Sequence, residues 1–270
     1  MPVYTSTLLE CRALQSSTRT CRRDAAAKTS AASARNTQSH CYLKVTHSML
    51  TKAQNNVVSY SGAALLFLVA LACFGRSPIA VAANISADAP HAAGSGLACV
   101  LWVLHFARRT VESALVEKHS QCSKTVPLAD SLSEFAYYWL FAIWIAHSLV
   151  TSQLLLPSFV PPATAACGWA LAELANFYAH LTLSRTPAKG GKRVLPVTRL
   201  FSLVCCPHYL AEASSWVFFS LCCPCAGSLL FTLAGAAIMT GYALERHRQY
   251  AACDTAFARS GRKAIIPFIL

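Results

Sequence analysis

The sequence predicts an all-α fold, a bundle of about six helices that cross a membrane more than once. The chain of 270 residues is 55% hydrophobic and only 13% charged, which is too apolar for an ordinary soluble protein. Apolar runs close to the ~20 residues needed to cross a bilayer recur along it. We place six such runs, at residues 57–74, 92–107, 134–150, 163–183, 200–222 and 227–244.

The distribution of positive charge predicts how these helices are oriented. Of the 23 lysine and arginine residues, 22 fall before the first run, after the second, after the fourth and after the sixth. Loops rich in lysine and arginine stay on the cytosolic side of a membrane. We therefore expect both termini in the cytosol, and we attribute the net charge of +12 to these loops rather than to nucleic-acid binding.

Residues 1–55 differ in composition from the rest of the chain. They are basic and rich in Ser, Thr and Ala, and they show no sustained period of 2 or 3.6. We expect a disordered N-terminal tail, with a mitochondrial-type presequence as the alternative because it shares this composition. Residues 56–270 form the predicted membrane domain.

The 13 cysteines do not predict a disulfide framework or a metal site. Many lie within or beside the apolar runs, where cysteine acts as a small hydrophobic residue. The segment Cys222-Cys223-Pro224-Cys225 contains a CxxC spacing, but no second Cys or His pair at zinc-ligand spacing accompanies it. We therefore expect no bound metal.

A first polar segment ends the second apolar run. His105, Arg108, Arg109 and Glu112 share one face of a helix. Basic residues at the end of a membrane helix can extend toward lipid headgroups. That alternative explains the arginines but not Glu112, so we expect a functional role for the segment.

A second polar segment lies within the fourth run. Glu173, Asn176 and His180 follow the spacing i, i+3, i+7 and lie on one helical face. Each such group needs a partner in hydrocarbon, so this face should point into the bundle. Contact with a ligand and a buried polar seam between helices both remain open.

The third segment, Cys206-Pro207-His208-Tyr209-Leu210-Ala211-Glu212, carries the most informative pattern. A carboxylate at a bilayer centre costs about 2.5–3.5 kcal/mol and indicates function. Pro207 predicts that the fifth helix begins there, with residues 200–206 at the membrane interface. Tyr209 and Glu212 then share a face near the cytosolic surface, where a phenol beside a carboxylate indicates proton chemistry.

The last segments are basic. Residues 246–250 read Arg-His-Arg-Gln-Tyr, and Arg262 and Lys263 follow. These cations could pair with the phosphates of a cofactor. They could equally be the positive charges that keep the last loop in the cytosol.

Taken in order, these segments resemble the steroid 5α-reductase superfamily, and within it the trans-2-enoyl-CoA reductases of very-long-chain fatty acid elongation. The resemblance runs from about His105 to Leu270. Its pieces are His105–Arg109 with Glu112, Val126-Pro127-Leu128 with Tyr137-Tyr138-Trp139, Glu173–Phe177 with His180, Cys206–Glu212 with Trp216, His247-Arg248 with Tyr250, and Ile265–Phe268.

The resemblance implies a steroid 5α-reductase-like membrane enzyme of the endoplasmic reticulum that uses NADPH. It would deliver hydride to C3 of a 2-enoyl-CoA in the last step of the elongation cycle. Its partners would be an acyl-CoA or other lipid enone, the bilayer and other elongation enzymes. Tyr209 matches the proton donor, with Glu212 beside it. The positions implied near the cofactor are Arg109, Asn176, His180, His208, His247, Arg248 and Tyr250.

The chain also departs from the pattern of the enoyl-CoA reductases. They usually carry Asn where this chain has His208, and here the segment resembles the polyprenol reductase branch. Reduction of a polyprenol or a 3-oxo-steroid enone is therefore the alternative function. A membrane methyltransferase and a non-catalytic scaffold are more remote alternatives. An acidic motif near the first span and a ubiquitin-like N-terminal domain of the family have no clear match.

Overall fold

The computed structural model describes residues 50–83, 90–116, 125–151, 160–186, 188–189, 192–196 and 198–269. Most of this part belongs to one compact unit, Ser48–Leu270. The predictions made for residues 1–49, the disordered tail and its presequence alternative, fall outside the described residues.

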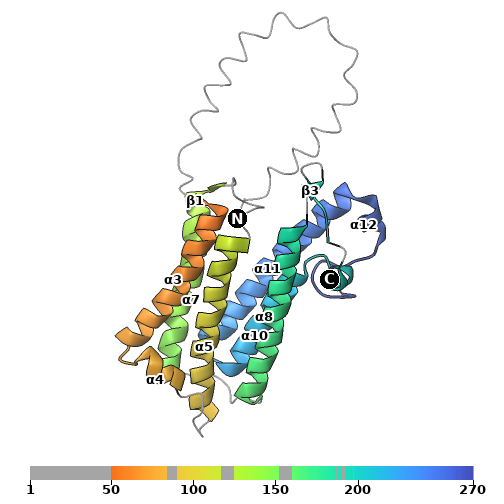
Figure 1. Cartoon of the computed structure of the whole chain (residues 1–270). Helices are drawn as coiled ribbons and strands as arrows, with labels where there is room; N and C mark the ends of the chain where they lie inside the picture. Colours follow the sequence, from red (N-terminus) through yellow and green to blue (C-terminus); the bar gives the residue numbers. More distant parts are fainter. Residues whose placement is uncertain are drawn as a thin grey trace, which may run out of the picture. The chain divides into compact units, whose positions relative to one another are not determined.

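Six long helices occupy the six predicted ranges (Figure 1). They are α3 (Lys52–Cys73), α5 (Pro90–Val111), α7 (Leu128–Val150), α8 (Pro162–Arg185), α10 (Pro207–Cys222) and α11 (Ala226–Cys253). The all-α class and the order of the helices are confirmed for the described residues. The short elements are α4 (Pro78–Ala83), the π-helical turn η3 (Glu112–Val116), α9 (Arg199–Leu203), α12 (Thr255–Arg259) and two antiparallel pairs, β1 (Leu50–Thr51) with β2 (Thr125–Val126) and β3 (Ala188–Lys189) with β4 (Lys192–Arg193).

The predicted count of six membrane crossings is supported at two helices. Lys52–Cys73 and Ala226–Ala252 are long and apolar enough to cross a membrane by length and composition. Helix α10 has only 16 residues, and at 1.5 Å per residue it is about 24 Å long, less than a hydrocarbon core of about 30 Å. Polar residues within α8 and α10 make these two helices less apolar than the predicted count of six membrane crossings assumes.

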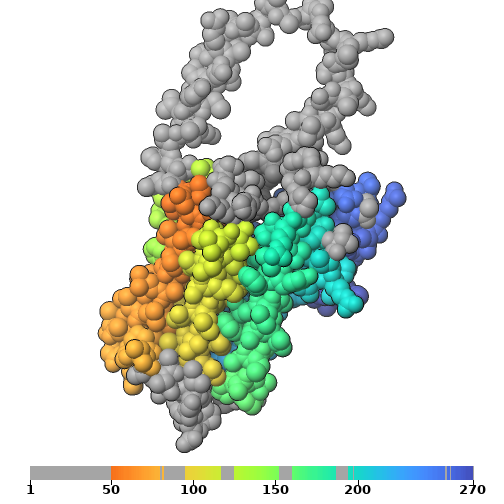
Figure 2. Space-filling view, in the orientation of Figure 1, coloured from red at the N-terminus to blue at the C-terminus, as the bar shows by residue number. Residues whose placement is uncertain are grey.

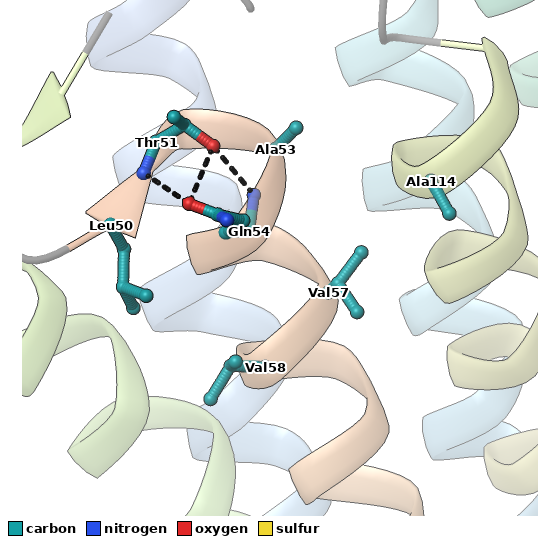
Figure 3. Close-up of a pocket in the computed structure, with 7 residues that line it drawn as sticks. All are labelled: Leu50, Thr51, Ala53, Gln54, Val57, Val58 and Ala114. Atoms are coloured by element: carbon teal, nitrogen blue, oxygen red, sulfur yellow. Dashed lines mark hydrogen bonds between the residues drawn. The ribbon is translucent and has the colours of Figure 1, made fainter.

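The start of the first helix corrects one predicted boundary. Thr51 caps α3, and its side chain and that of Gln54 form a reciprocal capping box (Figure 3). The helix therefore begins at Lys52, and residues 52–55 belong to the helix rather than to the tail. Its other end is closed by Gly75, whose φ of 77° suits the left-handed residue that follows a helix.

The predicted break at Pro207 is confirmed. Helix α9 ends at Leu203, and α10 begins at Pro207 with Cys206 as its N-cap. Proline suits the first helical position because the amide hydrogen it lacks would have no partner there. The segment before Pro207 is held by the C-terminal part of the chain, since Cys205 N donates to Lys263 O at 2.8 Å and Cys206 N to Ala264 O at 3.0 Å.

Aromatic side chains form the centre of the bundle. Trp102 of α5 is fully buried, and five other rings lie with their centroids 4.7–5.6 Å from it, those of Phe67, Phe106, Trp216, Phe219 and Phe231. Helix α8 packs most extensively on α10, and α3 on α7. In the space-filling view α3 (orange), α5 (yellow) and α8 (green to teal) lie side by side (Figure 2).

One close packing contact between α3 and α7 can be tested. A Cβ at Gly62 would overlap with the indole ring of Trp139, whereas Gly241 of α11 faces open space. We expect Gly62→Ala to lower the free energy of unfolding by about 1–3 kcal/mol. Gly241→Ala should raise it by about 0.5–1 kcal/mol, because alanine favours the helix. Thermal unfolding of the purified protein in detergent measures both, and equal midpoints would contradict the packing argument.

Candidate active site

Polar faces of α5, α8 and α10 meet inside the otherwise apolar bundle, around Glu173. Its carboxylate lies between two residues of α5: His105 Nδ1 is 2.8 Å from Oε1, and Arg108 Nε donates to Oε2 at 2.7 Å. Glu173 is 5% and His105 2% exposed, whereas the Arg108 side chain is partly exposed. Buried charges are stable only when they are paired and hydrogen-bonded, and here both conditions are met.

Arg108 joins three segments through its guanidinium. Besides Glu173 it donates to Glu112 at the start of η3 and, through Nη2, to Asn176 Oδ1 at 2.9 Å. The rigid fork of arginine donors suits such simultaneous contacts, which lysine could not reproduce. The first and second predicted polar segments therefore form one network, and each supplies the partners of the other.

Arg109 faces a neighbouring part of the interior. It is 4% exposed and pairs with Glu112, and its Nη2 lies 3.4 Å from the Tyr60 hydroxyl of α3. The guanidinium also lies 5.2 Å from the centroid of the Tyr60 ring, a cation–π arrangement. Sequence analysis missed Tyr60, because nothing in the spacing of α3 marks it; only the approach of α5 gives it a polar partner.

Asn176 connects this network to the Tyr209 segment. Its Nδ2 donates to the backbone oxygen of His208 at 2.8 Å and lies 3.4 Å from Glu212 Oε2. The His208 ring lies 4.1 Å from the Tyr209 ring and 5.4 Å from the His180 ring, measured between centroids. The structure thus brings together Asn176, His180, His208, Tyr209 and Glu212.

Glu212 differs from the other two acids of the site. Glu112 and Glu173 each accept from arginine side chains, whereas no lysine or arginine of the described chain lies within ion-pair distance of Glu212. Glu212 is only half buried. A carboxylate without a fixed counter-charge, on the same helical face as a phenol, can accept or orient a proton.

Three predicted cofactor residues lie outside this group. His247 Nε2 is 2.8 Å from the backbone oxygen of Arg262, and the rings of His247 and Tyr250 pack on Phe257 at 5.2 and 5.7 Å. The Arg248 side chain is 76% exposed and 4.0 Å from Glu245. These residues of α11 are organised by the C-terminal segment rather than by the network around Glu173.

A second carboxylate cluster was not predicted. Glu134 of α7 accepts from Lys52 at 2.9 Å and from Asn55 and Ser59 at 3.0 Å, all three on the first turns of α3. These contacts fasten α3 to α7 near the start of both helices. The residues were missed because each is an ordinary polar side chain at a helix end, and only their convergence on Glu134 distinguishes them.

A pocket of about 610 Å³ lies between the first turns of α3 and η3 (Figure 3). In the close-up, Val57 of α3 and Ala114 of η3 point toward the space between the two segments. The lining is mainly apolar and contains none of the predicted site residues.

The cysteine segment between α10 and α11 is built from packed thiols. Cys223 Sγ and Cys225 Sγ are 3.7 Å apart, and Cys222 Sγ donates to the backbone oxygen of Pro162 at 3.7 Å. In the part of the chain that the structure describes, no three His, Cys, Asp or Glu side chains gather in a way that could hold a metal ion.

The ionic network predicts strong coupling between Arg108 and Glu173. Removing one partner of a buried pair typically costs about 3–5 kcal/mol, so Glu173→Gln and Arg108→Gln should each lower the unfolding midpoint strongly. The double variant should be less destabilised than the sum of the two, by about 0.5–3 kcal/mol. Denaturant unfolding in detergent measures this cycle. Arg259→Gln, at an exposed position of α12, serves as the control, and strict additivity would disprove the network.

Comparison with known proteins identifies the family of the chain. A family model described as 3-oxo-5-alpha-steroid 4-dehydrogenase matches residues 124–270, just over half of the chain and including all of α8, α10 and α11. A protein of Trypanosoma brucei brucei named as an enoyl-CoA reductase is 35% identical over 178 residues, which cover 63% of this chain and 57% of the relative. The very-long-chain enoyl-CoA reductase of Dictyostelium discoideum is 29% identical over 188 residues, covering 68% and 61%.

A third relative carries a different name. The polyprenal reductase of Danio rerio is 32% identical over 189 residues, covering 64% of this chain and 60% of the relative. In each of these comparisons the chain spans less than two thirds of the length of the curated relative. The match over residues 124–270 nevertheless includes the Tyr209 segment and its Asn176 support. The chain therefore belongs to the 3-oxo-5-alpha-steroid 4-dehydrogenase family.

Proposed function

We propose that the chain is an NADPH-dependent reductase that reduces the 2,3 double bond of long- and very-long-chain trans-2-enoyl-CoA, the last step of the fatty acid elongation cycle. One observation carries the proposal: Tyr209 and Glu212 share a face of α10, and Asn176 holds that helix against the buried network. Relatives named as enoyl-CoA reductases at 29–35% identity support the substrate class.

The residues present fit a nicotinamide cofactor in part. Asn176, His180 and His208 offer polar atoms beside Tyr209, and Arg248 offers an exposed guanidinium that could bind a phosphate. Arg109 fits less well, because it is buried and its charge is already met by Glu112. We assign Arg109 a positioning role, and we assign phosphate binding to the end of α11.

The chemistry of the proposed reaction follows from the placement of Tyr209. A bound reduced nicotinamide supplies the hydride that adds to C3 of the enoyl thioester. Negative charge then develops from C2 to the thioester oxygen, and a hydrogen-bond donor at that place stabilises it. Tyr209 holds the proton at its phenol oxygen and delivers it to C2. Glu212, three residues further along α10, orients the phenol from the same face.

We further propose that the enzyme is a multi-pass protein of the endoplasmic reticulum membrane with both termini in the cytosol. Two membrane-length apolar helices and the alternation of basic loops support this placement. Other enzymes of the elongation cycle would then be its partners, because the same acyl-CoA passes between them.

The second candidate function is reduction of a polyprenol-type or 3-oxo-steroid enone. His208 favours it, since this position departs from the enoyl-CoA reductase pattern. The polyprenal reductase relative, at 32% identity, supports it as well. The two candidate functions use the same proton donor, Tyr209. They differ in the class of substrate that binds beside His208.

Substitution of Tyr209 tests the mechanism. Tyr209→Phe should reduce the rate of NADPH oxidation with a long-chain 2-enoyl-CoA by about 10²–10⁴-fold, the usual contribution of a general acid. Its unfolding midpoint should stay close to that of the unmodified protein. Tyr178→Phe, which removes an exposed phenol from α8, is the matched control and should keep full activity. Full activity in Tyr209→Phe would remove Tyr209 from the mechanism.

A substrate panel distinguishes the two functions. Purified protein with NADPH should turn over a long-chain 2-enoyl-CoA faster than a polyprenal or a 3-oxo-steroid enone. His208→Asn, which installs the residue usual in enoyl-CoA reductases, should increase this preference. Faster reduction of the polyprenal by the unmodified protein, with the preference reversed by His208→Asn, would establish the alternative instead.

A further inference from the structure

An apolar groove of about 360 Å³ runs along α8 and α10 on the side away from the site. Small residues form its floor, among them Ala172 and Ala175 of α8 and Ala211 of α10. Larger side chains such as Leu171 and Phe218 form its walls. The groove is long and narrow, since it follows α10 from Pro207 to Phe218, a span of about 16 Å at 1.5 Å per residue.

The groove is separate from the proposed reaction centre. On α8 it uses Ala172 and Ala175, whereas the ionic network uses Glu173 and Asn176. On α10 it uses Leu210, Ala211 and Ser214, whereas Tyr209 and Glu212 face the other side. The groove therefore lies on the outer faces of α8 and α10, and Glu173 and Glu212 lie on the inner faces of the same two helices, so a ligand of the groove would not be the substrate.

The surroundings of the groove identify the chemistry of its occupant. The one hydroxyl among its lining side chains, that of Ser214, already donates to the backbone oxygen of Leu210 at 2.8 Å. An apolar chain in the groove would therefore leave no side-chain hydroxyl without a hydrogen-bond partner. The adjoining turn holds Phe268 89% exposed at a φ of 66°. Such a conformation is unfavourable for a bulky residue, and an exposed ring beside an apolar groove suits lipid better than water.

Positive charge lies at one end of the groove. Arg199 precedes Leu200, which lines it, and Lys263 is paired through a backbone bridge with Val204, which also lines it. Both side chains are exposed, and neither is within ion-pair distance of an acidic side chain among the residues that the structure describes. An apolar chain that carries an anionic group at this end would be complementary to both features.

We propose that the groove binds one acyl chain of an anionic phospholipid from the membrane, with Arg199 and Lys263 at its headgroup. The volume lies within the range of about 300–1,000 Å³ usual for small-molecule sites. This lipid site does not depend on the reductase activity, because it lies on the opposite side of α8 and α10. It would hold α9 and the start of α10 at the membrane surface.

Photochemical labelling tests the site. The full chain is placed in bilayer discs that contain phosphatidylserine with a photoreactive acyl chain, and labelled residues are mapped by mass spectrometry. We expect labels on the groove faces of α8 and α10. Ala175→Phe should reduce them about tenfold or more, because filling the groove costs at least the ~1.4 kcal/mol that a factor of ten represents. Ala170→Phe, at an exposed position of α8 outside the groove, should leave them unchanged.

Two further variants complete the test. Ser214→Leu fills the groove from α10, so the result does not depend on the folding of one variant. In Arg199→Gln with Lys263→Gln, the preference for phosphatidylserine over phosphatidylcholine should fall about fivefold for each charge removed, whereas Arg259→Gln should keep it.

Three outcomes would overturn the proposal. These are uniform labelling of the outer surface, labelling unaffected by either groove-filling variant, and cross-links between two copies of the chain across the groove. The first two would show ordinary surrounding lipid, and the third a protein contact. Each can occur with the enoyl-CoA assay positive or negative, so failure of the lipid site is distinguishable from failure of the proposed reaction.

Discussion

The structure depends on one partly buried arginine and the groups that neutralise it. Arg108 donates to Glu173 of α8, to Glu112 of η3 and to Asn176, so one guanidinium fixes α5 and α8 against each other. In an apolar bundle each of these charges would be costly alone, and their pairing removes most of that cost. The network therefore selects a single arrangement of helices that hydrophobic packing alone would leave less defined.

The same network determines where chemistry can occur. Because Arg108 holds the Asn176 oxygen, the Asn176 amide nitrogen is directed at His208 and Glu212. Glu112 and Glu173 are committed to arginines, which leaves Glu212 as the acid whose charge is not already balanced. The ion network and the site proposed for proton chemistry thus lie side by side, joined by the Asn176 side chain.

The start of α10 is held from a second direction. The C-terminal segment donates backbone oxygens to Cys205 and Cys206, and Arg262 Nη1 donates to the backbone oxygen of Phe201 at 3.2 Å. These contacts hold the segment between α9 and α10 and set Tyr209 in the first turn of α10. They also place Lys263 beside the apolar groove between α8 and α10. The C-terminal segment therefore supports both faces of α10, the polar face that carries Tyr209 and the apolar face that lines the groove.

The ranges of the long helices could be predicted from the sequence, because apolar runs and Pro207 act locally. The resemblance over ordered segments also predicted that Asn176, Tyr209 and Glu212 serve one site, which stays a prediction. The sequence also contained the Thr51–Gln54 capping box that corrects the tail boundary, although the composition of the tail concealed it. Three contacts could not be read from the sequence: Tyr60 faces Arg109, Glu134 joins α3 to α7, and His247 contacts the C-terminal segment. The physical reason is that helical spacing fixes which residues share a face, whereas the partner of that face comes from a segment distant in sequence, and its choice depends on packing and charge balance across the whole bundle.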